Sequence, residues 1–345
     1  MTKRRLPAEW EKQSGIMLTW PQQESDWATN YQAATKTFID IATQISHEEL
    51  ALIVCANEKH LSHVQQELGK SSATTANLRF VIAPSNDTWA RDHGPITIFE
   101  ENAPVLLDFI FNGWGNKYPS DRDNAITRTV YEAGVFGKYS IQQVAFVLEG
   151  GSIESDGRGT LLTTAHCLLS ATRNPGFSKQ EITNQLKQQL GTERILWLEH
   201  GALAGDDTDG HIDTLARFCN ENTIAYVACD DSDDEHYAEL TAMEGELKNF
   251  RQTNNSPYHL IRLPLPSAIY NEEGKRLPAT YANFLIINHA VLVPTYNDNK
   301  DAEALATLAT CFPGRKIIGI DCCALIQQYG SLHCVTMQLP NEILV

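Results

Sequence analysis

The sequence predicts an α/β fold in which short strands outnumber helices. Short apolar runs rich in Val, Ile, Leu and aromatic residues recur along the chain, and polar residues, Gly or Pro flank them. Longer segments with helical periodicity separate some of these runs. About two predicted strands accompany each helix, whereas a doubly wound parallel sheet has closer to one. This ratio favours repeated ββαβ-like units, although no clear sequence repeat is visible.

The predicted elements follow one another from one end of the chain to the other. Strands are expected at 16–20, 50–56, 78–83, 105–109, 143–148, 160–164, 223–229, 259–263, 284–287, 290–293 and 316–320. Helices are expected at 26–45, 59–68, 178–190, 234–250 and 300–311. Ser178 and Glu181 form the pattern of a capping box, and Gly191 stands where a helix would end. Because no linker or low-complexity tract interrupts this order, residues 1–345 are expected to form a single catalytic domain.

Composition and charge are those of an acidic globular protein. Of the 345 residues, 27 are Lys or Arg and 43 are Asp or Glu, which gives a formal net charge of −16. An acidic surface repels nucleic-acid phosphates and anionic membranes, and its field attracts cationic ligands. The longest apolar runs, such as 50–56, are too short to cross a bilayer. A small cationic substrate is therefore the expected partner, and a homo-oligomer is left open.

The cysteines and the N-terminal segment indicate the compartment. The first residues are basic but lack the apolar core of a signal peptide. The eight cysteines are irregularly spaced and include no C-x-x-C pair, which fits neither a disulfide framework nor a common zinc site. We therefore expect a cytoplasmic protein with reduced cysteines and no metal or other cofactor. Most cysteines should be buried structural residues, and one or two should be reactive.

Polar residues that follow predicted strands are candidates for a binding site, because functional residues cluster on loops over a rigid scaffold. Residues 86–95 read NDTWARDHGP and include Trp89 and Asp92. Residues 112–117 read NGWGNK and place Trp114 between glycines. From the residues alone, the first segment could equally be a polar turn, and Trp114 could be a loop anchor instead of a pocket wall.

Two further segments carry carboxylates and a histidine. Residues 148–154 read LEGGSIE, so that Glu149 ends an apolar run and precedes two glycines. Residues 205–213 read GDDTDGHID. This second pattern resembles part of a calcium loop, but it lacks the acid at the twelfth position and the flanking EF-hand pattern. In an extended segment, His211 and Asp213 would point to the same face.

The last candidate segment, residues 329–336, reads YGSLHCVT and places Cys334 after a Gly-containing turn. Alone, Cys334 is more often a buried strand cysteine. A thiol, a histidine and several carboxylates together suit a guanidinium, because carboxylates hold its planar fork and a thiolate can add to its carbon. His211 would protonate the departing ammonia and then activate water, and Glu149 would orient it. A cationic His211 and the substrate would lower the pKa of Cys334.

These segments together resemble the agmatine deiminases, guanidine-modifying enzymes related to the bacterial peptidylarginine deiminases. WARDHGP, EGGSIE, DDTDGHID and GSLHCVT stand in that family's order. LPAEWE, NGWG, RNPGFSK and YANF extend the resemblance over nearly the whole chain. The resemblance implies a pentein-type α/β propeller, in which five ββαβ modules surround a pseudo-fivefold axis and the site lies at the central mouth.

The resemblance also implies a role for each candidate residue. Cys334 would be the nucleophile, His211 the acid/base and Glu149 its support. The implied substrate contacts are the guanidinium ligands Asp92 and Asp213 and the further contacts Asp207, Trp89 and Trp114. Two residues depart from the family pattern: Ser331 replaces the second glycine before the nucleophile, and Asn116 replaces a glycine after Trp114. Both departures bear on substrate fit and rate.

The implied reaction is hydrolysis of agmatine to N-carbamoylputrescine and ammonia through an amidino-cysteine, as a step of putrescine and polyamine biosynthesis. Free arginine or peptidyl-arginine is an alternative substrate. An arginine-selective site should supply a cation for a carboxylate, and Arg91 is the obvious candidate in these acid-rich segments. Amidino transfer on the same scaffold is a second alternative. A metal- or polyamine-binding protein that uses residues 206–213 is the non-enzymatic one.

Overall fold

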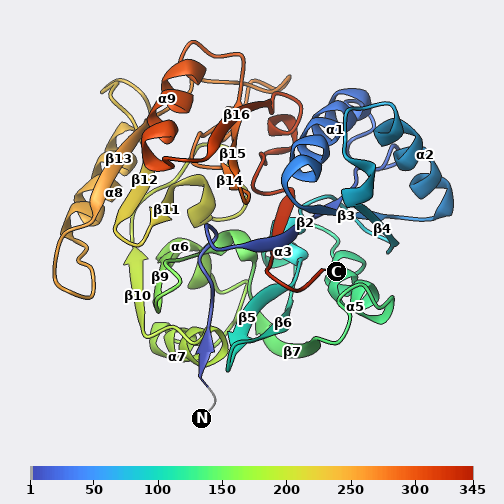
Figure 1. Ribbon diagram of the computed structural model, residues 1–345. Helices are drawn as coiled ribbons and strands as arrows, with labels where there is room; N and C mark the ends of the chain where they lie inside the picture. The colour runs from blue at the N-terminus through green and yellow to red at the C-terminus, as the bar shows by residue number, and fades with distance from the viewer. Residues whose placement is uncertain (1–2, 345) are drawn as a thin grey trace.

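The strands form five sheets that surround a common centre, as Figure 1 shows for the residues that the computed structural model describes, 3–344. With hydrogen-bonded strands named next to each other, the first sheet contains β1 (Arg4–Arg5), β5 (Ile96–Glu100), β6 (Ala103–Ile110) and β7 (Ser140–Val147), and the second contains β10 (Arg194–Leu198), β9 (Thr160–Thr164) and β8 (Ile153–Ser155). The third contains β11 (Ala216–Asn220), β12 (Thr223–Ala228) and β13 (His259–Pro264), and the fourth contains β14 (Leu285–Ile286), β15 (Ala290–Thr295) and β16 (Lys316–Asp321). The fifth contains β17 (Thr336–Pro340), β2 (Gln13–Thr19), β3 (Leu50–Cys55) and β4 (Leu78–Ile82).

Each sheet combines an antiparallel pair with a parallel pair. For example, β5 is antiparallel to β6, and β6 is parallel to β7. The same alternation recurs in the other sheets. A parallel neighbour requires a crossover, which a helix supplies. The crossover helices are α5 (Asp123–Glu132), α7 (Lys179–Leu190), α8 (Tyr237–Asn249), α9 (Asp301–Cys311) and α1 (Tyr31–Glu48). The predicted ββαβ modules are therefore confirmed.

The fifth module is assembled from the two ends of the chain. Strand β17 pairs antiparallel with β2, and Met337 lies opposite Met17. Strand β2 then pairs parallel with β3, and α2 (Glu58–Gly69) leads from β3 to β4. The last described strand thus closes the ring onto the second one. This pairing fixes the segment just before β17, which contains Cys334.

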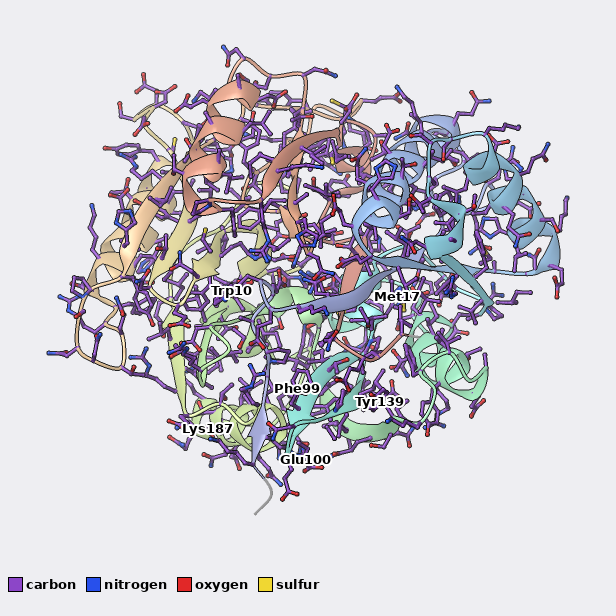
Figure 2. The ribbon with its side chains drawn as sticks, in the orientation of Figure 1. Trp10, Met17, Phe99, Glu100, Tyr139 and Lys187 are labelled. Atoms are coloured by element: carbon purple, nitrogen blue, oxygen red, sulfur yellow. The ribbon has the colours of Figure 1, made fainter. Side chains whose placement is uncertain are left out.

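Apolar faces of the helices cover the sheets and close the core. On α1, Phe38, Ile41 and Ile45 are fully buried at helical spacing, and Phe38 meets Trp20 edge to face, with ring centroids 5.5 Å apart. Figure 2 shows side chains filling the space between the ribbons, with Met17 in the interior. The residues facing the common centre are thereby held on a packed scaffold.

Sequence and structure agree on the existence of the predicted elements and differ at their boundaries. The capping box at Ser178 is present, and Gly191 adopts a φ of 69° at the end of α7, as predicted. Helix α1 begins at Tyr31 and not at residue 26, because residues 23–30 form turns. Helix α5 was not predicted, since its sequence DNAITRTVYE is rich in β-branched residues. The missed strands are β1, β5, β8, β10, β11 and β17.

Two further features concern the helices and the cysteines. Among residues 3–344, no helix has the length and apolar character needed to cross a membrane. All eight cysteines are free thiols, and seven of them are buried, whereas Cys323 is half-buried. Cys334 is thus one buried thiol among several, and its surroundings must distinguish it from the others.

Candidate active site

One cavity of about 740 Å³ brings together segments from four of the predicted motifs. The predicted residues that line it are Trp89, Asp92, Trp114, Asp207, His211, Asp213 and Cys334. The lining residues that the sequence did not single out are Asp26, Asp87, Tyr118, Asp206, Thr208, Thr214, Gln328, Tyr329 and Gly330. No Lys or Arg is among these described lining residues. The cavity is therefore suited to a cation.

Asp92 lines this cavity from α3 (Ala90–His93), a single helical turn after the strand β4. Its Oδ2 accepts from Trp114 Nε1 at 2.9 Å, and its Oδ1 accepts from Gly151 N at 3.0 Å. Burial raises the pKa of Asp92 to about 6, with smaller contributions from Asp213 and Glu149. Asp92 is thus a fixed, buried carboxyl that titrates close to neutral pH.

Trp114 is both a loop anchor and a pocket wall, the two roles that the sequence left open. It lies within α4 (Gly113–Asn116) in the left-handed region, with φ 55° and ψ 48°, which costs a non-glycine residue energy and marks functional sites. Its ring meets Phe111 edge to face, with centroids 5.0 Å apart. Asn116 is also left-handed, with φ 65°, a conformation that Asn tolerates well. The departure from glycine at Asn116 is therefore compatible with the turn.

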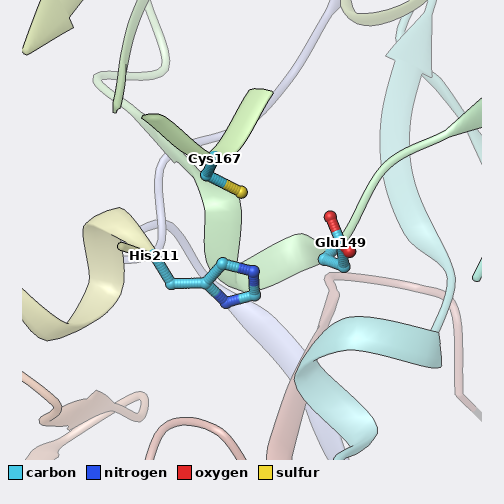
Figure 3. Close-up of side chains that lie close together, drawn as sticks. All are labelled: Glu149, Cys167 and His211. Atoms are coloured by element: carbon cyan, nitrogen blue, oxygen red, sulfur yellow. The ribbon is translucent and has the colours of Figure 1, made fainter. Parts of the chain in front are cut away.

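His211 directs its Nε2 edge toward Glu149 and Cys167, as Figure 3 shows. One donor atom from each of these three buried residues lies within 4.8 Å of the other two. Within the described part of the chain, neither His211 Nε2 nor Glu149 Oε2 has a hydrogen-bond partner of good geometry. The other ring nitrogen, Nδ1, lies 3.6 Å from Asp92 Oδ1. His211 is thus placed between two carboxyl groups and a thiol.

These neighbours determine the protonation of His211. Burial lowers its pKa, but Asp92, Cys167 and Glu149 raise it more, so that the pKa lies well above the usual value. Glu149 is fixed by Arg173, whose Nε donates to Oε1 at 3.0 Å. Both side chains of this ion pair are fully buried. These neighbours therefore favour the imidazolium form of His211.

Arg173 is a residue whose importance the sequence did not reveal, although it lies in the RNPGFSK motif. Its guanidinium pairs with Asp209, and its Nη2 donates to the Thr208 carbonyl at 2.8 Å. It therefore connects Glu149 with the loop that leads to His211. Without an expectation of the fold, nothing in the spacing of these residues could have indicated this contact.

The Asp213 side chain lies next to the thiol. It belongs to a 3-10 turn, Ile212–Thr214, so the expectation of an extended segment at His211 and Asp213 is wrong, although both residues line the cavity. Asp213 Oδ2 lies 2.7 Å from His333 Nδ1, and Oδ1 has no described partner. Burial raises the pKa of Asp213, but the hydrogen bond with His333 and the charges of His211 and Arg217 lower it more. Asp213 is thus an anion with one free oxygen.

Cys334 lies 3.9 Å from Asp213 Oδ2 and 3.4 Å from Asn283 Oδ1, measured from its sulfur. Burial, together with Asp213 and Asp92, raises its pKa well above the usual value. Any lowering of this pKa by His211 is thus outweighed, first by burial and then by the two carboxylates. Ser331, the second departure from the family pattern, is buried and pairs with the Tyr296 hydroxyl at 2.8 Å.

Two glycines near the site leave no room for a side chain. A Cβ at Gly151 would lie 2.6 Å from His211 Nδ1 and 2.8 Å from Asp92 Oδ1. A Cβ at Gly330 would overlap the ring of Trp89. Trp89 is held by Asp87, which accepts from its Nε1 at 2.8 Å. Farther out, Asp207 Oδ2 accepts from the Tyr118 hydroxyl at 2.9 Å. Each glycine thus permits close packing around the cavity.

Glu149, Cys167 and His211 are also the residue types that bind zinc. A metal ion there would occupy the Nε2 edge of His211, which faces Glu149 and Cys167. Arg173 already holds one oxygen of Glu149, and its charge opposes a second cation. The three side chains are better suited to orienting His211 and holding its proton.

The fold and this site define a pentein-type α/β enzyme with a buried cysteine, a histidine and paired carboxyl groups around an acid-lined cavity. The chain belongs to the Porphyromonas-type peptidyl-arginine deiminase family, whose model matches residues 5–340. A curated agmatine deiminase of Pseudomonas aeruginosa (strain LESB58) is 32% identical in an alignment 359 residues long, gaps included, which covers 97% of this chain and 95% of the relative. The non-enzymatic alternative is therefore set aside.

Solved structures agree with this assignment. A putative arginine deiminase from Porphyromonas gingivalis is 49% identical, with a TM-score of 0.94 over 99% of this chain and 100% of that one. A C. jejuni agmatine deiminase with substrate bound is 38% identical, with a TM-score of 0.91 over 98% and 96% of the two chains. An amidinotransferase from Microseira wollei, 11% identical with a TM-score of 0.51 over 97% and 96% of the two chains, shares the fold alone.

Proposed function

We propose that the protein hydrolyses agmatine to N-carbamoylputrescine and ammonia through an amidino-cysteine intermediate. The observation that carries this proposal is the position of the Cys334 sulfur, 3.9 Å from Asp213 and in one cavity with Asp92 and His211. Carboxylates on either side of a guanidinium would hold its plane and leave the carbon open to the sulfur. We further propose that residues 1–345 act as one cofactor-free catalytic domain in the cytoplasm, in putrescine synthesis.

In this mechanism, substrate binding activates the thiol. In the ligand-free protein the pKa of Cys334 is raised by burial and by Asp213 and Asp92. A bound guanidinium neutralises the field of these carboxylates and favours loss of the thiol proton to solvent. The substrate thereby supplies the charge that makes the nucleophile, so that the thiolate forms mainly when a target is present.

The thiolate of Cys334 then adds to the guanidinium carbon, and a carbon–nitrogen electron pair moves onto nitrogen. His211, protonated at neutral pH, donates its proton to the departing nitrogen. The carbon–nitrogen bond breaks, ammonia leaves, and a cationic amidino group remains on the sulfur. Glu149 and Arg173 hold His211 in place for this transfer.

The neutral His211 next takes a proton from water as the water oxygen adds to the amidino carbon. The carbon–sulfur bond breaks, and its electron pair returns to Cys334 as a thiolate. The protonated ureido product releases its proton to solvent. One water is consumed and one ammonia is formed, and His211 is again an imidazolium, ready for the next substrate.

The charge of the cavity favours agmatine over free arginine. Agmatine lacks the α-carboxylate of arginine and is therefore a dication, and the described lining of the cavity contains several Asp residues but no Lys or Arg. Arg91, the candidate cation in the sequence, directs its guanidinium to Glu9 and Gln338 and lines a different cavity. Asp207, Trp89 and Trp114 would contact the distal part of the substrate in this proposal.

The test is to incubate the purified protein with agmatine, free arginine and a peptide with C-terminal arginine, and to measure ammonia and ureido product. We expect product from agmatine at the highest kcat/KM, and none from Cys334→Ser. Mass spectrometry of acid-quenched protein should show an amidino adduct on Cys334. A protein without turnover of agmatine would refute the proposal. A guanidino product formed from an added amine would instead support amidino transfer.

A further inference from the structure

A second histidine adjoins the nucleophile, and no part of the proposed mechanism uses it. His333 precedes Cys334, and its side chain is 1% exposed. Its Nδ1 lies 2.7 Å from Asp213 Oδ2, whereas its backbone N–H donates to Asn283 Oδ1 at 2.9 Å. His333 therefore contacts Oδ2 of Asp213, the proposed guanidinium ligand, whereas Oδ1 of Asp213 has no described partner. His333 itself does not line the cavity.

The other ring nitrogen of His333 faces a buried ion pair. Its Nε2 lies 3.0 Å from Arg217 Nη2 and 2.9 Å from Glu9 Oε1. Arg217 is fully buried, pairs with Glu9, and donates its Nε to Glu154 Oε2 at 2.7 Å. A neutral His333 accepts from Arg217 at Nε2, so its single proton is on Nδ1 and points at Asp213. A cationic His333 would donate to Glu9 and would still donate to Asp213.

Both protonation states therefore give Asp213 the same donor. Burial and the charges of Arg217 and Arg91 lower the pKa of His333, so the neutral form with its proton on Nδ1 dominates at neutral pH. Glu9 comes from a turn in the N-terminal segment 6–12, more than three hundred residues before His333 in the chain. The N-terminal turn thus contacts His333, the residue next to the nucleophile.

We propose that His333 is a positioning residue that keeps Asp213 ionised and aims its free oxygen at the substrate guanidinium, with the His333 tautomer set by Arg217 and Glu9. This inference rests on the proposed deimination and adds to it a buried support for substrate binding. The groups that face Asp213 from the surrounding elements are His333, His211, Asp92, Cys334 and Arg217. Of these, His333 alone makes a hydrogen bond shorter than 3 Å to it.

The experiment compares His333→Leu with His333→Asn in the full-length protein. Leu removes the donor, whereas the Asn amide nitrogen occupies nearly the position of Nδ1 and keeps it. A hydrogen bond to a charged group affects equilibria by about tenfold or more, so we expect His333→Leu to raise KM for agmatine by about that factor. Because Asp213 then protonates more easily, the acid limb of kcat/KM, which Asp92 sets, should become steeper. His333→Asn should restore both quantities most of the way.

A matched control is available in His236, which is also buried and has its Nδ1 2.8 Å from Asp234 Oδ1, outside the cavity. His236→Leu should lower thermal stability and leave KM and the pH profile unchanged. If the parent protein does not turn over agmatine, the proposed function fails. If the parent is active and His333→Leu loses stability with an unchanged KM and acid limb, or if His333→Asn behaves like His333→Leu, the positioning role is refuted.

Discussion

Trp114 donates its indole N–H to Asp92 at 2.9 Å from a left-handed backbone conformation that few tryptophans adopt. The turn that carries Trp114 also packs its ring against Phe111 and Tyr118, so the donor cannot easily move away. Strain in the backbone is thus balanced by ring packing and by one hydrogen bond to a site carboxyl.

Trp114→Phe should keep the packing and remove the donor. Because the indole hydrogen bond lowers the pKa of Asp92, its loss should raise that pKa above about 6 and weaken guanidinium binding at neutral pH. We expect kcat/KM for agmatine to fall by about tenfold, the usual effect of a hydrogen bond to a charged group. Trp197→Phe, which lies outside the cavity, is the matched control and should retain full activity.

The pH profile of kcat/KM should be bell-shaped. On the acid side, Asp92 must lose a proton to hold the guanidinium, and its pKa of about 6 predicts loss of activity below that pH. On the alkaline side, His211 must be protonated to release ammonia, and its raised pKa keeps activity well above neutral pH. Glu149→Gln should lower the pKa of His211 and move the alkaline limb down. An unchanged alkaline limb in that variant would argue against the Glu149–His211 pair.

The thiol of Cys334 should react slowly with alkylating agents in the ligand-free protein. Burial and two carboxylates raise its pKa, so little thiolate exists at neutral pH. We expect iodoacetamide labelling of Cys334, followed by peptide mass spectrometry, to accelerate steadily from pH 7 to pH 10 without a plateau. Fast labelling at pH 7 that saturates below pH 8 would show that the thiolate is already present before the substrate binds.

Two Gly→Ala substitutions should have opposite effects. Gly330→Ala would place a methyl group into the Trp89 ring, so both the melting temperature and activity should fall. Gly245 lies within α8, and a Cβ there meets no atom within 4 Å. Gly245→Ala should therefore stabilise the protein by up to about 1 kcal/mol without changing kcat/KM. Differential scanning calorimetry with parallel activity assays measures both outcomes.

The sequence predicted the segments that have a regular apolar pattern and missed those that are short or irregular. Continuous apolar runs such as 50–56 and 223–229 were recognised as strands, since Val, Ile and Leu dominate them. Strand β8 has three residues and β1 has two, too few for any periodic signal. Helix α5 was missed because tertiary burial of Ile126 and Val130 outweighs its modest local propensity.

For the site, motifs predicted the residues that line the cavity and the support of His211 by Glu149, but they did not reveal the contacts of Arg173 and His333. Asp92, His211 and Cys334 stood in recognisable segments, and the structure brings them to one cavity. Arg173 and His333 act through contacts with residues distant in the chain, and no local pattern encodes such contacts. The pKa of Cys334 was also beyond local reasoning, because its direction depends on how deeply the fold buries the sulfur and on the carboxylates that it places nearby.

The antiparallel pairing of β17 with β2 affects how the protein becomes active in the cell. During translation, the segments that hold Asp92, Glu149 and His211 leave the ribosome well before Cys334. The nucleophile can reach its place only when β17 has emerged and paired with β2, a strand translated more than three hundred residues earlier. A nascent chain therefore cannot assemble this site before β17 is released, and translation that stops before β17 should yield a protein without activity.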